Sequence, residues 1–181
     1  MSDIKEPWKE WPDIWSSKAK FMSYLRGGIR RAIWNRSPIK HSVIHKKRKR
    51  VLNGKTGNMV WGGTCYICKQ DFVASQLQVD HIKGEHSLKE LSDIQSFVEA
   101  MTCLSEDDLD TICEVCHQFK SHAERKRLSF EEAVIDKKAI EFMKKPVKDV
   151  VKVLTEHNLP SNNSAVRRKG IKQLFEEGKL K

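Results

Sequence analysis

The chain has 181 residues, and its 34 Lys and Arg against 24 Asp and Glu give a formal net charge of +10. This length is enough for one modest hydrophobic core, with appendages that depend on a ligand for order. No apolar run approaches the roughly 20 residues of a membrane span, and the amino terminus lacks a secretory signal pattern, so we expect a soluble, intracellular protein. In a reducing compartment, the five cysteines favour metal binding over disulfides.

The positive charge is concentrated at the amino-terminal end. Residues 1–60 hold 15 Lys and Arg against 4 Asp and Glu, and no acidic residue occurs between Asp13 and Asp71. A single-sign field of this length favours a polyanion as partner, and nucleic acid phosphates are the natural one. A solvated tail or a localisation signal is the alternative. The candidate DNA contacts are Arg30, Arg31, Lys46, Lys47, Arg48, Lys49 and Arg50.

The same arm has recognisable local patterns. Pro7 and Pro12 argue against one regular helix there, and we expect the three tryptophans between residues 8 and 15 to pack on the core rather than stack on bases. An apolar stripe at intervals of four predicts a helix within residues 16–36, which Gly27-Gly28 kinks or splits. The stripe consists of Phe21, Leu25, Ile29 and Ile33. Turns are predicted further on, at Gly54, Gly57, Gly62 and Gly63.

Two Cys-x-x-Cys pairs dominate the central segment. Cys65 and Cys68 form the first pair, and Cys113 and Cys116 the second. Four thiolates at this spacing are typical of a closed, tetrahedral structural zinc site. We expect the remaining Cys103 to be a small buried apolar residue, and Trp61 and Tyr66 to pack around the zinc.

Asp80 and His81 lie between the two cysteine pairs. The pattern predicts a short strand over residues 77–82, a second strand over 109–112, and a helix from Glu114 to about Arg127 that carries His117. Ser87 and Glu90 have capping-box spacing and predict a helical insertion at about 87–104.

The residues around Asp80 have the types that phosphodiester hydrolysis needs. A carboxylate and a second histidine suit a catalytic divalent ion, and a neutral histidine can accept a proton from water. Because adjacent strand residues point to opposite faces, Asp80 and His81 serve one site only if the strand bends or ends there. An ordinary surface His–Asp hydrogen bond is the alternative.

These motifs resemble those of the zinc-bearing HNH endonucleases, above all free-standing members encoded by phages. Val79-Asp80-His81-Ile82, Asp108-Leu109-Asp110-Thr111-Ile112-Cys113 and Cys116-His117-Gln118-Phe119-Lys120 are similar to the family pattern D-H-I followed by N-L-x-x-L-C-x-x-C-H-x-x-K. The resemblance implies a ββα-metal fold over about residues 61–127, with His81 as general base, Asp80 and His117 as ligands of Mg²⁺ or Mn²⁺, and the four cysteines as zinc ligands. Asp108 occupies the position of the family's asparagine, where it can accept hydrogen bonds but cannot donate them as an amide does.

The carboxy-terminal part is predicted to be helical. Ser129 and Glu132 form a second capping box, and Ser164 is expected to cap the last helix. A helix, a turn and a basic helix are compatible with a DNA-reading element, and equally with a plain helical hairpin. Lys120 is a further candidate DNA contact, on a helix whose basic residues either hold phosphates or form a solvated face. We expect His86 and His122 to be surface residues.

The sequence therefore predicts an α+β protein with three parts, namely a basic arm at 1–60, a nuclease core at 61–127 and a helical module at 128–181. The predicted function is metal-dependent cleavage of double-stranded or branched DNA in the cytoplasm of a bacterial host, by a phage-encoded enzyme. Two alternatives remain: a nuclease-derived DNA-binding module that has lost catalysis, and an interaction protein built on a zinc ribbon. The sequence leaves the oligomeric state open.

Overall fold

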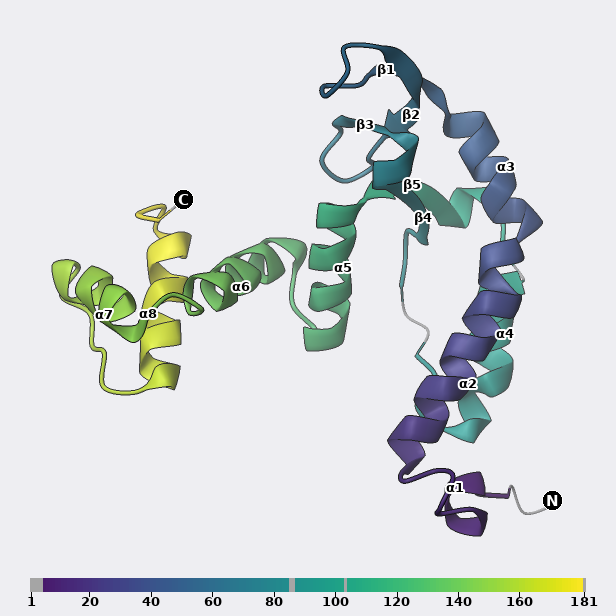
Figure 1. The fold of residues 1–181 in the computed structure, drawn as a ribbon, viewed down its shortest axis with the longest axis horizontal. Helices are drawn as coiled ribbons and strands as arrows, with labels where there is room; N and C mark the ends of the chain where they lie inside the picture. The colour runs from purple at the N-terminus through teal and green to yellow at the C-terminus, as the bar shows by residue number, and fades with distance from the viewer. Residues whose placement is uncertain (1–4, 85–86, 103, 181) are drawn as a thin grey trace. The chain divides into compact units, whose positions relative to one another are not determined.

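The computed structural model describes residues 5–84, 87–102 and 104–180, so the predictions for His86 and Cys103 lie outside the described residues. The fold combines helices with two small sheets, which confirms the α+β class (Figure 1). The chain divides into two compact units, residues 1–114 and residues 115–181. Among the described residues, no helix is both long and apolar enough to cross a bilayer.

The first unit begins with helices that pack through an apolar stripe. They are α1 (Pro7–Glu10), α2 (Lys18–Ala32), the 3₁₀ turn η1 (Trp34–Arg36) and α3 (Pro38–Lys47). Ser17 caps α2 by accepting a hydrogen bond from the Lys20 amide at 3.2 Å. The helix runs through Gly27-Gly28 without a break, so the predicted split is wrong. Its stripe packs, together with Met22 of the same helix, against Leu88 and against Phe97 and Met101 of α4 (Ile94–Thr102).

The amino-terminal tryptophans divide into two kinds. Trp8 joins the α2 cluster, and the ring of Trp15 meets that of Phe21 edge-on at 5.0 Å. Core packing is therefore confirmed for Trp8, whereas the ring of Trp15, within the described residues, contacts only Phe21, at the edge of that cluster, and the exposed Tyr24. Trp11 remains 50% exposed, so the expectation was wrong for it.

An antiparallel three-stranded sheet follows α3, in the order β1 (Lys49–Leu52), β2 (Met59–Thr64) and β3 (Asp71–Val73). Gly54 and Gly57 belong to the β1–β2 connection, as predicted, and Gly57 has a φ of +72°. Gly62 and Gly63 lie inside β2 instead, so the turn predicted there is wrong. A Cβ at Gly62 would lie 2.1 Å from the Phe72 carbonyl oxygen, which explains the glycine by close packing rather than by a turn.

The second sheet is a two-stranded antiparallel pair, β4 (Leu77–His81) and β5 (Leu109–Cys113), which agrees with both predicted strands. The α3 helix packs against this pair, with Val43 of α3 in contact with Val79 and Leu109. Three short 3₁₀ segments lie before and between the strands. They are η2 (Ala74–Gln76), η3 (Leu91–Asp93) and η4 (Glu106–Asp108).

The predicted helical insertion is present, but it begins later than expected. The Asp93 carboxylate accepts hydrogen bonds from the amides of Lys89 and Glu90 at 2.9 and 2.8 Å, which makes Glu90 the capping residue. Ser87 and Leu88 therefore precede the helical turns, and the capping box predicted at Ser87 is wrong.

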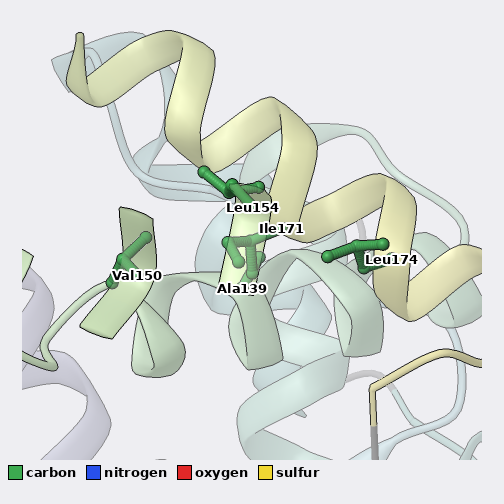
Figure 2. Packing of buried hydrophobic residues seen from close by; sticks show 5 residues of the cluster. All are labelled: Ala139, Val150, Leu154, Ile171 and Leu174. Carbon is green, nitrogen blue, oxygen red and sulfur yellow. The ribbon is translucent and has the colours of Figure 1, made fainter. Parts of the chain in front are cut away.

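The second unit is helical. It contains α5 (Glu114–Lys126), which begins at the last residue of the first unit, and then α6 (Phe130–Phe142), α7 (Val147–Glu156) and α8 (Ser164–Glu176). The capping box of Ser129 and Glu132 is confirmed, whereas α8 is capped by Asn163 and not by Ser164. Figure 2 shows the core that α6, α7 and α8 share, made of Ala139, Val150, Leu154, Ile171 and Leu174.

Candidate metal centre and active site

The four paired cysteines come together. The Sγ atoms of Cys65, Cys68, Cys113 and Cys116 all lie within 4.8 Å of one another. The first pair is held in a tight turn by the hydrogen bond from the Lys69 amide to the Cys65 carbonyl at 2.9 Å, and Lys69 has a φ of 59°. The second pair joins the end of β5 to the first turn of α5. No other group of three or more metal ligands occurs among the described residues.

This arrangement fits a tetrahedral zinc ion. With Zn–S bonds of about 2.3 Å, neighbouring sulfur atoms are about 3.8 Å apart, which is compatible with the observed cluster. Burial raises the pKa of the Cys65 thiol, but donors from Cys113, Cys68 and Ile67 outweigh it and lower the pKa to about 7. The protein therefore favours the deprotonated, thiolate form of Cys65, which is the form that binds a metal ion.

His81 is the last residue of β4, and two contacts fix its ring. The ring stacks on Trp34 with centroids 4.5 Å apart and an interplanar angle of 20°, and its Nε2 lies 2.9 Å from the Ala100 carbonyl oxygen. Because a carbonyl oxygen only accepts hydrogen bonds, Nε2 carries the proton. In the neutral ring, Nδ1 is then the atom that can accept a proton. No hydrogen bond to Nδ1 is found within the part of the chain that the structure describes.

Asp80 lies beside a set of charged residues that the sequence did not connect with it. Its direct partner across the sheet is Asp110, whose carboxylate pairs with Lys47 Nζ at 2.8 Å. Burial lowers the pKa of Lys40, and the charge of Asp80 opposes that change. Lys40 Nζ also lies 5.0 Å from the centre of the Trp34 ring. Trp34 thus contacts both His81 and the lysine that interacts with Asp80, so the two adjacent strand residues share one neighbourhood.

Asp108 forms a local cap rather than a side-chain contact with His81. Its carboxylate accepts hydrogen bonds from the Ser105 amide at 2.7 Å and the Ser105 hydroxyl at 2.9 Å, and these bonds lower its pKa. Its main-chain carbonyl accepts the Ile82 amide at 2.8 Å. The backbone of Ile82 is therefore hydrogen-bonded to the backbone of Asp108. The Asp108 side chain only accepts hydrogen bonds.

His117 is a half-buried residue of α5, directly after Cys116. Asp80 belongs to the first unit and His117 to the second, so their joint role as metal ligands stays a prediction. Lys120, on the same helix, is buried and pairs with Glu124 at 2.7 Å. Because its side chain is buried, Lys120 is less accessible to a DNA phosphate than a lysine on a solvated helix face.

The basic run at residues 46–50 is partly neutralised within the protein. Lys46 pairs with Glu106, Lys47 with Asp110, and Lys49 with Asp71. These acids come from the segment between residues 71 and 110, so the long single-sign stretch in the sequence is not a single-sign surface in the fold. Of the other candidate contacts, Arg31 is exposed, and Arg30 is exposed with its guanidinium 5.9 Å from the centre of the Phe97 ring.

Two further expectations were wrong. Trp61 does not pack around the cysteines, since it is 51% exposed with the Arg48 and Arg50 guanidinium groups 4.7 and 5.5 Å from its ring centre. His122 is not a surface residue, since it is 4% exposed and its Nε2 lies 2.8 Å from the Asp136 carboxylate.

Sequence reasoning missed three contributors to the candidate active site. The Asp110 position follows from the register of β4 and β5, in which Asp80 and Asp110 are paired. Trp34 follows the predicted apolar stripe by one residue, and its aromatic ring was the available signal. Ala100 contributes only a main-chain carbonyl, for which no side-chain signal exists.

Comparison with protein family models, curated proteins and solved structures found no match to this chain.

Proposed function

We propose that this protein is an HNH-type endonuclease that hydrolyses DNA phosphodiester bonds with the help of a divalent metal ion. The observation that carries the proposal is how the His81 ring is packed and hydrogen-bonded. Its Nε2–H is held by the Ala100 carbonyl and its ring by Trp34, which leaves Nδ1 as the accepting atom. A general base needs a fixed ring and one accepting nitrogen, and His81 has both.

The order of elements supports the same proposal. Two antiparallel strands, β4 and β5, are followed by α5, which is the order of a ββα-metal motif. The four-cysteine cluster joins the turn between β2 and β3 to the end of β5 and the first turn of α5. A zinc ion there would act as a structural staple, since all four ligand positions are filled by protein thiolates.

The residues proposed for a catalytic ion are Asp80 and His117. A carboxylate oxygen and an imidazole nitrogen suit Mn²⁺ and tolerate Mg²⁺. Such an ion supplies charge neutralisation at the phosphate and at the leaving oxygen. His81 would take a proton from the attacking water at Nδ1. The capped turn of Asp108 and its backbone bond to Ile82 would hold the loop after His81 in place.

The proposal is tested by incubating the purified protein with supercoiled plasmid in the presence of Mg²⁺, Mn²⁺ or EDTA. We expect nicked or linear products with metal and none with EDTA. His81→Ala should lower the cleavage rate by at least about 100-fold, the usual contribution of a general base, while DNA binding changes little. His41→Ala, at an exposed histidine of α3, is the matched control and should cleave normally. Wild-type-like cleavage by the His81 variant would remove this residue from the mechanism.

The same assay separates the alternatives. A binding module without catalysis would retain DNA binding and give no cleavage with any of the metals. An interaction protein would show neither cleavage nor salt-dependent DNA binding, although it would still hold zinc at the cysteines.

A further inference from the structure

An exposed tryptophan with two arginines over its ring lies on the first sheet. Trp61 in β2 is directly opposite Arg50 in β1, and Arg48 is two residues before Arg50. Arg48 directly precedes β1 and its backbone is already extended, so its side chain lies on the same face as that of Arg50. Both guanidinium groups reach the indole, at 4.7 and 5.5 Å from its centre. Arg50 also donates to the Met59 carbonyl, which fixes its position. We call Arg48, Arg50 and Trp61 the Trp61 patch.

Successive side chains of an extended chain point to opposite faces, so Lys49 lies on the face opposite to Arg48 and Arg50. Lys49 pairs there with Asp71 at 2.7 Å. Within the described ranges, neither Arg48 nor Arg50 forms an ion pair with an acidic residue. The Trp61 patch therefore combines uncompensated positive charge with an aromatic surface, and it is complementary to a ligand that is both anionic and planar.

A pocket of about 240 Å³ adjoins the Trp61 patch. Trp61, Gly63 and Leu77 provide apolar wall, and Arg48 brings positive charge, whereas Lys47, which also lines the pocket, is paired with Asp110. A Cβ at Gly63 would come within 3.3 Å of Leu77 Cδ1, so glycine keeps this wall free of a side chain. The volume is below the roughly 300–1,000 Å³ of pockets for drug-sized ligands, and it suits a single planar ring system.

The pocket is close to the candidate active site along one strand. Gln78 and Val79 of β4 line it, and Asp80 and His81 are the next two residues. At about 3.3 Å per residue, His81 is within roughly 10 Å of these lining residues along β4. A base held in the pocket would have its flanking phosphates in the neighbourhood of the candidate site.

We infer that the Trp61 patch and its pocket bind an unpaired base of DNA, so that the protein prefers single strands, flaps or bubbles to continuous duplex. Bases in a duplex are stacked and cannot insert their faces against an indole, whereas unpaired bases stack on aromatic side chains with little regard to sequence. Arginine adds contacts to the phosphates on either side. The identity of the nucleic acid rests on the proposed function.

The test measures binding by fluorescence anisotropy, with labelled DNA as a single strand, a duplex with a central bubble, and a continuous duplex. We expect wild-type protein to bind the first two more tightly. Trp61→Ala should weaken them by about tenfold or more, with the salt dependence unchanged because stacking involves no counterion release. Trp61→Phe should retain most of the affinity. Trp11→Ala, at a tryptophan that is equally exposed but has no cation over its ring among the described residues, is the matched control.

A second DNA isolates the base. A single strand whose bases are replaced by abasic sites keeps its phosphates, so wild-type protein should bind it about as weakly as Trp61→Ala binds the normal strand. Equal binding of abasic and normal strands, or a Trp61→Ala variant that binds unpaired DNA like the wild type, would overturn the inference and leave the patch as a site for a protein partner.

The outcomes also separate this inference from the proposed function. Absence of cleavage with every metal, combined with Trp61-dependent binding of unpaired DNA, would overturn the nuclease and support the Trp61 patch. Metal-dependent cleavage with equal affinity for paired and unpaired DNA would support the nuclease and overturn the patch.

Discussion

The two units are stabilised in different ways. In residues 1–114 the apolar residues form separate small clusters, one between α2 and α4 and another between α3 and the β4–β5 pair. In residues 115–181 the helices α6, α7 and α8 share one contiguous core (Figure 2). Three of the four clustered cysteines belong to the first unit and the fourth to the first turn of α5. The first unit is therefore expected to depend on a metal, whereas the second unit gains its stability from apolar burial.

The chain itself offers a way to observe the units separately. All five tryptophans, at positions 8, 11, 15, 34 and 61, lie in residues 1–114. Tryptophan fluorescence therefore reports the first unit alone, while the helical circular dichroism signal reports both.

Metal removal should have the largest effect. Structural zinc contributes about 10–16 kcal/mol of apparent binding free energy in zinc-finger peptides, and that free energy becomes folding free energy. We expect one zinc ion per chain in the wild type. Cys113→Ser should lose this ion and show unfolded-like tryptophan fluorescence, while the helical signal of the second unit persists.

Metal analysis and the two spectroscopic signals measure this outcome. Val115→Ala, at a 58% exposed position between the two cysteines, is the control and should keep the zinc. A folded, metal-free wild type would contradict the dependence of the first unit on zinc.

A cavity in the core of the second unit should destabilise that unit by an intermediate amount. In contrast to metal removal, it should change the helical signal and leave the tryptophan fluorescence unchanged. Leu154 is fully buried in the α6–α7–α8 core, and Leu154→Ala should cost about 2–5 kcal/mol. We expect an earlier loss of the helical signal on heating, with unchanged zinc content and unchanged tryptophan fluorescence. Val147→Ala, at a 59% exposed position of the same helix, should stay within about 0.5 kcal/mol of the wild type. A parallel shift of the fluorescence transition would show that the two units unfold together.

The elements that could be predicted are those with a local signal. The strands of residues 77–81 and 109–113 and the helices after residue 113 follow apolar periodicity, and the cysteine spacing led directly to the four-sulfur cluster. The α3 helix and the β1–β2 pair were missed because the apolar stripe predicted a helix only within residues 16–36, and the glycines further on predicted turns. Pro38 is the first residue of α3, where its missing amide hydrogen costs nothing, and Gly62 is required by the neighbouring strand.

The polar environments were less predictable, because they depend on partners far apart in the sequence. Lys46 and Glu106 are 60 residues apart, and the ring of His81 is fixed by Trp34 and by a main-chain carbonyl. The surface position expected for His122 overlooked Asp136, which lies 14 residues further along the chain. Charge counts along a sequence therefore describe composition, whereas the surface charge follows from the fold.

The smallest expected effect concerns the buried polar group of the second unit. Arg125 lies 3.1 Å from His122 Nδ1, and since a guanidinium only donates, Nδ1 accepts and Nε2–H donates to Asp136. Arg168 donates to both oxygens of the same carboxylate, at 2.7 and 2.9 Å. Burial alone would raise the pKa of Asp136, but the hydrogen bonds from His122 and Arg168 outweigh it and hold the pKa below its ordinary value.

The sign of the resulting pH dependence follows from this depressed pKa. As the pH falls through about 4, the unfolded chain takes up the proton at Asp136 before the folded chain does, so the stabilisation present at neutral pH is lost. Asp136→Asn removes the charge at every pH. The difference in melting temperature between the wild type and this variant, followed by the helical signal, should therefore be largest near neutral pH and shrink as the pH falls below about 4. Glu156→Gln, at an exposed position of α7, should show no such difference. A gap between the wild type and Asp136→Asn that stays constant from pH 7 to pH 3 would mean that packing around this residue, and not its charge, stabilises the second unit.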